Sequence, residues 1–189
     1  MSYLAVAVTG VAVLSLVNSW LIIALARKLR GHGGELTHQP SRPRPVVGLP
    51  AGTQVPEFTA KTMADATVTA EDLRGGRSVI GFFSPGCAPC HEQSPAFAAF
   101  ARALPGGVTS TLAVICGGRA AARAADGDAG RLAEQLADAT DVVGEPSAGM
   151  VAAALGVSGF PSFIVIDADG RVEAGAHTVT AIAGIAASA

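Results

Sequence analysis

Charged residues make up only 15% of this 189-residue chain, and aromatic residues only 5%. Basic and acidic side chains nearly balance, with a formal net charge of −2, so the chain lacks the basic field that nucleic-acid binding requires. The shortage of aromatic rings also excludes a surface on which bases stack. Half of the residues are hydrophobic, which is too apolar for a disordered chain. We therefore expect a folded protein with no nucleic-acid partner.

Cysteine is equally scarce, with three residues in the chain. Three cysteines are too few for a small secreted fold held together by disulfides. The chain has no second C-x-x-C pair, so it lacks the four thiolates of the commonest structural zinc sites. We therefore expect neither a metal nor a cofactor, and attention falls on the single cysteine pair.

The first part of the chain is a long hydrophobic run. Residues 3–26 contain no charged side chain, and 24 residues in a helix reach about 36 Å, enough to cross the hydrocarbon layer of a membrane. The sequence Ala24-Leu25-Ala26 also fits the cleavage pattern of a signal peptide. The run is longer than the hydrophobic part of a signal peptide, and no basic residue precedes it. We predict an uncleaved transmembrane anchor over residues 1–26 that contacts membrane lipid through residues 3–26.

A linker rich in proline, glycine and basic residues follows over residues 27–50. Five basic residues lie within it, and Glu35 is its one acidic residue. By the positive-inside rule, this excess of positive charge favours a cytoplasmic position for everything that follows the anchor. These basic residues are Arg27, Lys28, Arg30, Arg42 and Arg44.

Residues 51–189 have the alternating pattern of an α/β domain. A buried strand is predicted over 78–84, a helix from the cysteine pair to about residue 104, and a second strand over 112–115. Strand 162–166, the turn 167–170 and strand 171–174 predict a hairpin, and 178–187 predicts a closing helix. The pattern indicates a central mixed sheet flanked by helices. Smaller elements are expected at 55–60 with 67–69 (an edge hairpin), 69–75 (a helical turn), 119–139 (helix, broken near 126–128), 142–143 (strand) and 148–155 (helix).

The string Cys87-Ala88-Pro89-Cys90 follows the first buried strand and opens the first helix. A helix amino terminus stabilises a thiolate, which would make Cys87 nucleophilic. Cys90 lies one turn later and can attack a mixed disulfide on Cys87. Pro89 stiffens this turn and Ala88 adds no charge, so these two residues support the motif but give no strong reason for an extremely oxidising potential.

The cysteine pair is also compatible with a haem site or a zinc site. With His91, the string is C-x-x-C-H, the attachment motif of c-type haem, which also needs a second axial ligand. The pair can also form half of a zinc site, to which His91 and Cys116 would contribute. The position between a buried strand and a helix favours the redox interpretation. Cys116 itself is expected to be a buried, inert thiol, although a third redox thiol at this strand end is the alternative.

Phe160-Pro161 stands directly before the strand 162–166. A proline that opens a strand is ordinary at a sheet edge. Phe160-Pro161 is, however, one of several motifs that together resemble the thioredoxin superfamily, and within it the membrane-anchored TlpA/ResA/MauD-like (redoxin) group. The resemblance covers the chain from about Gly52 onward. The other motifs are Val55-Pro-Glu-Phe58, Gly81–Cys90, Pro95, Gly159–Phe163 and Asp167–Gly170.

The resemblance implies a thioredoxin-like fold in which a cis proline, Pro161, packs against the dithiol. Phe160 and Pro161 would then shape the groove in which a client peptide pairs as an added strand. It implies a membrane-tethered thiol–disulfide oxidoreductase with Cys87 and Cys90 as catalytic residues. Its partners would be protein thiol or disulfide clients and an electron-donating redox partner. Relatives of this kind act outside the membrane, in contrast to the side that the basic linker favours.

Three positions depart from the family pattern. Gly86 replaces the usual tryptophan before the first cysteine, so the rim of the site would be less covered. Gly81 and Gln93 stand where relatives have an aspartate or a glutamate that accepts a proton from the resolving thiol. Glu92 or His91 is a candidate substitute, although exposed residues early in a helix commonly have no such part. The loss of both carboxylates keeps one alternative function open, a thioredoxin-fold binding or scaffold protein without turnover. The peroxidase pattern P-x-x-x-T-x-x-C is absent.

Overall fold

The fold is that of a computed structural model, which describes residue 15 and residues 47–104, 108–124 and 127–187. Apart from residue 15, which is helical, the predicted anchor lies outside these residues, as does the linker before residue 47. Among the residues that are described, no helix combines the length and apolar character needed to cross a membrane. Contacts divide the chain into two units, Met1–Pro43 and Arg44–Ala189, and the folded domain is the second.

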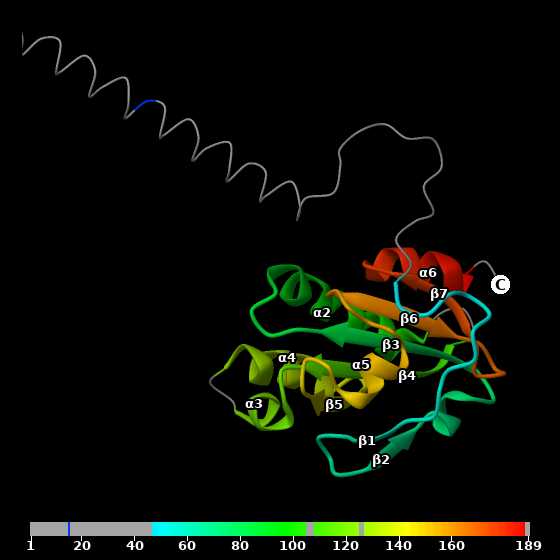
Figure 1. Cartoon of the computed structure of the whole chain (residues 1–189), viewed down its shortest axis with the longest axis horizontal. Coiled ribbons are helices and arrows are strands. Elements are labelled where there is room, and N and C mark those ends of the chain that lie inside the picture. The colour runs from blue at the N-terminus through cyan, green and yellow to red at the C-terminus, as the bar shows by residue number, and fades with distance from the viewer. Residues whose placement is uncertain (1–14, 16–46, 105–107, 125–126, 188–189) are drawn as a thin grey trace, which may run out of the picture. The chain divides into compact units, whose positions relative to one another are not determined.

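The domain is built on a five-stranded sheet with strand order β5-β4-β3-β6-β7 (Figure 1). Three strands are parallel: β3 (Arg77–Phe83), β4 (Val108–Cys116) and β5 (Asp141–Glu145). The hairpin of β6 (Ser162–Ile166) and β7 (Val172–Ala176) completes the sheet: β6 pairs antiparallel with β3, and β7 pairs antiparallel with β6. The predicted mixed sheet is confirmed, and the domain has the thioredoxin-like α/β fold.

Helices cover both faces of this sheet, as its two-sided hydrophobic strands require. One face is covered by α2 (Ala88–Ala103), α3 (Arg119–Arg123), α4 (Asp128–Ala137) and α6 (Val179–Ala187). The other face is covered by the 3₁₀ turn η1 (Glu71–Leu73), by α5 (Met150–Ala154), and by the hairpin of β1 (Thr59–Lys61) and β2 (Thr67–Thr69). The helical break near residue 126 is confirmed, since α3 ends at Arg123 and α4 begins at Asp128.

Side-chain alternation along β3 separates the core into two clusters. Val79 and Phe83 point to the α2 face, and Ile80 and Phe82 point to the opposite face. All four are fully buried, so both faces of this strand are hydrophobic, as the uninterrupted apolar run predicted.

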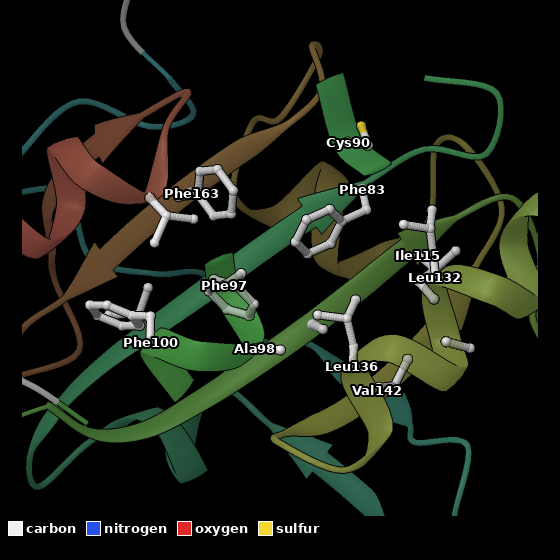
Figure 2. Packing of buried hydrophobic residues seen from close by; sticks show 14 of the residues in the cluster. Phe83, Cys90, Phe97, Ala98, Phe100, Ile115, Leu132, Leu136, Val142 and Phe163 are labelled. Carbon is white, nitrogen blue, oxygen red and sulfur yellow. The ribbon is translucent and has the colours of Figure 1, made fainter. Parts of the chain in front are cut away.

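Three phenylalanine rings form the centre of the α2-side cluster, between α2 and the sheet (Figure 2). The ring of Phe97, on α2, lies 5.6 Å from that of Phe83 and 5.5 Å from that of Phe163, measured between centroids. Phe83 and Phe163 meet edge to face at 5.7 Å. Such contacts add to the free energy gained by burying the rings, so this cluster holds α2 on the sheet.

The predicted small elements are present, with bounds that differ by a few residues. The edge strand predicted over 55–60 is reduced to β1, which pairs with β2 from Thr59 onward. The turn that Thr69 and Asp72 were expected to open is a 3₁₀ turn rather than an α-helical one. The Thr69 backbone N–H and hydroxyl both donate to Asp72 Oδ2, at 2.7 and 2.8 Å. These two hydrogen bonds lower the pKa of the Asp72 carboxyl, chiefly through the Thr69 hydroxyl.

Replacing Phe97 by alanine should test the role of the aromatic cluster. A Phe→Ala change in a packed core costs about 3–5 kcal/mol, and we expect Phe97→Ala to lower the free energy of unfolding in urea by that amount. Glu92→Ala, an exposed change on the same helix, is the matched control and should stay within about 0.5 kcal/mol of the wild type. Similar losses in the two variants would contradict the role given to the cluster.

Candidate active site

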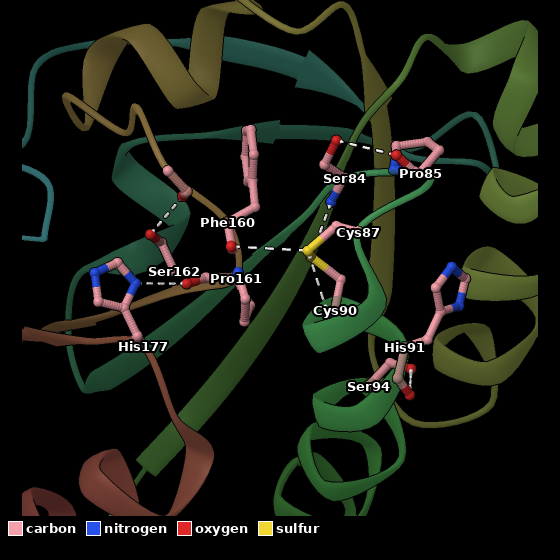
Figure 3. The surroundings of a disulfide bond; sticks show 11 residues. Ser84, Pro85, Cys87, Cys90, His91, Ser94, Phe160, Pro161, Ser162 and His177 are labelled. Atoms are coloured by element: carbon pink, nitrogen blue, oxygen red, sulfur yellow. Dashed lines mark hydrogen bonds between the residues drawn. A yellow bond between two sulfur atoms is a disulfide. The ribbon is translucent and has the colours of Figure 1, made fainter. Parts of the chain in front are cut away.

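The two cysteines of the C-x-x-C string lie at the junction of β3 and α2 (Figure 3). After Phe83 the chain turns through Gly86, whose φ of +73° favours glycine, and Cys87 then becomes the amino-terminal cap of α2. Cys87 and Cys90 are joined by a disulfide. The pair therefore has the helix-terminal position that the sequence predicted.

Each sulfur atom accepts a hydrogen bond from a backbone N–H group. The Cys90 N–H donates to Cys87 Sγ at 3.3 Å, and the Ser84 N–H donates to Cys90 Sγ at 3.4 Å. These donors, together with the amino end of a 16-residue helix, favour negative charge on sulfur. Cys90 is fully buried and Cys87 is partly exposed, so Cys87 is the sulfur that an incoming disulfide can reach.

The Phe160-Pro161 segment lies directly opposite the disulfide. The peptide bond between these residues is cis, as the resemblance implied. The Phe160 carbonyl oxygen is 3.7 Å from Cys87 Sγ, and Pro161 is buried at the start of β6. Figure 3 shows both residues facing the sulfur atoms across this short gap. The structure thus brings Cys87, Cys90, Phe160 and Pro161 together at one end of the sheet.

The helix residues between and before the cysteines line the outer side of the site. Ala88 and Pro89 are exposed in the first turn of α2, with Pro89 at a helix position that tolerates a missing N–H. Gly86 is also exposed, and a Cβ built on it meets no atom within 4 Å. The rim is therefore open at the position where relatives have a tryptophan.

Aromatic rings occupy the space around Gly81. A Cβ at Gly81 would lie 3.0 Å from ring atoms of both Phe83 and Phe97, so no acidic side chain fits there without a shift of the cluster. Gln93 is engaged with α6, since its Oε1 accepts a hydrogen bond of 3.0 Å from the Val179 N–H. Both departures from the family pattern thus have structural roles of their own.

His91 and Glu92, the candidate substitutes for a missing carboxylate, do not reach the sulfur atoms. Neither side chain forms a hydrogen bond with Cys87 or Cys90 among the residues described. In Figure 3 the His91 ring points away from the disulfide. The alternative that one of them accepts a proton from the resolving thiol gains no support from this geometry.

Two contacts around the site were not found from the sequence. His177 Nδ1 lies 2.7 Å from the Pro161 carbonyl oxygen, which ties the start of β6 to the end of β7. Gly117, just after β4, packs against the loop before the disulfide: a Cβ there would lie 2.4 Å from Pro85 Cγ. Neither residue belongs to a recognisable sequence motif, and only the tertiary fold brings each of them next to the site.

Cys116 is buried at the end of β4, in the cluster on the opposite face of the sheet from Cys90. Burial, aided by the charge of Glu145, raises the pKa of the Cys116 thiol to about 12. Glu145 is itself buried, which raises the pKa of its carboxyl even though the N–H groups of Val151 and Ala152 donate to it. The expectation of a buried, unreactive thiol agrees with this environment.

The zinc site that would join Cys116 and His91 to the cysteine pair does not assemble. Cys116 and Cys90 lie on different faces of the sheet. Within the described part of the chain, no three or more histidine, cysteine, aspartate or glutamate side chains gather in a metal-binding arrangement.

Comparison with known proteins agrees with this geometry. The model of the AhpC/TSA family matches residues 51–174, which include the disulfide, the Phe160-Pro161 segment and most of the sheet. The chain belongs to the AhpC/TSA family. This AhpC/TSA protein is also similar to the thioredoxin-like protein YneN of Bacillus subtilis, with 28% identity over 81 residues. That match covers 43% of this chain and 47% of YneN, so it spans about half the length of the curated relative.

Two solved structures share the fold of this AhpC/TSA domain at low sequence identity. The thioredoxin domain of a thiol-disulfide oxidoreductase from Bacteroides vulgatus has a TM-score of 0.57 and 18% identity, and the match covers 72% of this chain and 95% of that one. A secreted disulfide oxidoreductase of Mycobacterium tuberculosis, homologous to E. coli DsbE, has a TM-score of 0.54 and 20% identity, with 70% and 96% covered.

Thiol labelling should distinguish the three cysteines. We expect a reduced, folded sample at pH 8 to react with iodoacetamide at Cys87, and at the buried Cys90 and Cys116 only after unfolding. Burial also keeps the Cys116 thiol protonated. Mass spectrometry of the labelled peptides gives the order of reaction. Labelling of Cys116 in the folded protein at the rate of Cys87 would contradict the buried position.

Proposed function

We propose that this protein is a thiol–disulfide oxidoreductase that reduces or exchanges disulfides in client proteins. The observation that carries the proposal is the Cys87–Cys90 disulfide at the amino end of α2, with one sulfur accessible and 3.7 Å from the Phe160 carbonyl. Membership of the AhpC/TSA family and the thioredoxin-like fold support it.

The reaction needs only the two thiols of the protein and the disulfide of the client. The Cys87 thiolate attacks one client sulfur, forms a mixed disulfide and expels the other client sulfur as a thiolate, which takes up a proton. The Cys90 thiolate then attacks Cys87 Sγ, re-forms the Cys87–Cys90 bond and releases the first client sulfur. The client gains two electrons and two protons, and the dithiol loses the same number. A dithiol redox partner returns the protein to its reduced state by the same exchange.

The Phe160-Pro161 segment is proposed to bind the client next to the attacking sulfur. An extended peptide can pair with the backbone of the half-buried Phe160, as an added strand does at a sheet edge. Its disulfide would then lie beside Cys87, the more exposed of the two sulfurs. The open space above Gly86 leaves room for bulky client side chains on this side of the site.

We further propose the architecture and the subgroup that the sequence indicates. Residues 1–26 would anchor the protein in the membrane, 27–50 would act as a tether, and 51–189 would form the redox domain, as in TlpA/ResA/MauD-like proteins. The uncharged run over 3–26 and the motifs from Val55 to Gly170 support this arrangement. The basic linker favours the cytoplasmic side for the redox domain and the family resemblance favours the outer side, so the side is assigned by experiment.

Cysteine variants test the proposed chemistry in an insulin-reduction assay. We expect Cys87→Ser to lower the rate by at least about a hundredfold, and Cys90→Ser to accumulate a mixed disulfide with insulin that mass spectrometry detects. Cys116→Ala is the matched control and should keep the wild-type rate. A wild-type protein that binds client proteins but turns over no disulfide would instead support the scaffold alternative.

Cell fractionation tests the proposed anchor. We expect the full chain to remain in the membrane fraction after alkaline carbonate extraction, and a variant that lacks residues 1–26 to be released. Protease treatment of intact cells then assigns the side, since only an extracytoplasmic redox domain is digested without lysis. Release of the full chain by carbonate would contradict the anchor.

A further inference from the structure

The segment that connects β7 to α6 touches both halves of the candidate site. His177 Nδ1 lies 2.7 Å from the Pro161 carbonyl oxygen, and because a carbonyl only accepts, this nitrogen must carry the proton and donate. Two residues later, the Val179 N–H donates to Gln93 Oε1 at 3.0 Å. We call residues 177–179 the connecting segment.

These two hydrogen bonds end on opposite sides of the same gap. Pro161 follows Phe160, whose carbonyl oxygen faces Cys87 Sγ at 3.7 Å. Gln93 lies on α2, within one turn of the buried Cys90. Figure 3 shows the His177 ring on the far side of the Phe160-Pro161 segment from the disulfide. The connecting segment therefore links the Phe160-Pro161 segment to α2, the two elements that flank the disulfide and that we take as the walls of the proposed client-binding groove.

Neither hydrogen bond belongs to the regular secondary structure. The β6–β7 ladder pairs Phe163 with Ala176, its pair closest to the site, so the Pro161 carbonyl lies beyond that pairing and receives the His177 side chain instead. The Val179 N–H belongs to the first turn of α6, where backbone donors have no partner within the helix, and Gln93 satisfies it from another element. Each contact thus uses a side chain to join one wall of the gap to the connecting segment.

We infer that His177 and Gln93 are positioning residues that set the geometry of the client-binding groove by joining its two walls to the connecting segment. This inference rests on the proposed oxidoreductase function. A protein client needs the groove in order to align its disulfide with Cys87. A small disulfide such as hydroxyethyl disulfide needs only access to the Cys87 sulfur, so its reduction should not depend on the connecting segment.

The two types of disulfide therefore provide the test, with the full-length chain assayed in detergent against insulin and against hydroxyethyl disulfide. We expect His177→Ala and Gln93→Ala each to lower kcat/KM for insulin about three- to tenfold, mainly through KM, the range for one lost hydrogen bond. The rate with hydroxyethyl disulfide should change less than twofold. His177→Asn keeps an N–H donor near the Nδ1 position and Gln93→Glu keeps an acceptor, so both should retain most of the insulin activity.

Two control variants separate positioning from a general loosening of α6. Thr178→Ala removes the hydroxyl that accepts the Ala181 N–H but leaves both groove contacts in place. Thr180→Ala changes an exposed position on the same helix. Both should keep the ratio of insulin to hydroxyethyl disulfide activity seen in the wild type.

Three results for His177→Ala and Gln93→Ala would overturn the inference and leave the proposed function standing. They are equal losses of activity with the two substrates, unchanged insulin activity in both variants, or loss of the folded state in thermal melting. A wild-type protein that reduces neither substrate would overturn the proposed function, and this inference with it. The two failures are thus distinguished by the wild-type measurement.

Discussion

The packing of Phe97 against Phe83 and Phe163 is the contact on which the candidate site depends. These rings fix α2 to the centre of the sheet, with Phe97 held between residues of β3 and β6. Because α2 begins immediately after Cys87, the position of the helix also fixes the two sulfur atoms. The same β6 strand that supplies Phe163 begins just after Pro161, so one aromatic cluster aligns the disulfide and the facing loop.

The same packing leaves no room for an acidic side chain at Gly81, where the family pattern has an aspartate. Rings of Phe83 and Phe97 already crowd the position at Gly81, where a side chain would need space, and Gln93 is engaged with α6. The hydrogen-bond donors that meet the sulfur atoms are instead the N–H groups of Ser84 and Cys90, and the Phe160 carbonyl oxygen lies 3.7 Å from Cys87 Sγ. A backbone donor stabilises a thiolate at any pH at which the protein is folded, since it does not titrate. Fixed dipoles, and not an ionisable side chain, are therefore the donors that face the two sulfur atoms in the described part of the chain.

The helices and strands of this fold could be predicted where neighbouring residues in the sequence determine them. The apolar run of β3, the helix after Cys90 and the hairpin of β6 and β7 follow from periodicity and turn residues. The Cys87–Cys90 pair and the loop at Pro161 were predicted from short sequence motifs. The contacts of His177 and Gly117 were not predictable, because each joins segments far apart in the sequence and neither residue type is distinctive. The hydrogen bond between Gln93 and the Val179 N–H at the start of α6 was not predicted either. The family pattern has a glutamate at position 93, and it contains no information on a contact with α6.

The close contact between Gly117 and Pro85 bears on how this site can be moved between proteins. Transplanting Pro85–Cys90 onto another thioredoxin-like scaffold would carry over the cysteines and the start of α2. It would not carry over Gly117, whose backbone lies against the ring of Pro85. A recipient with any larger residue at the end of the neighbouring strand would push the grafted loop outward and shift its first sulfur. The smallest unit that can be exchanged is thus discontinuous, a hexapeptide plus one distant glycine.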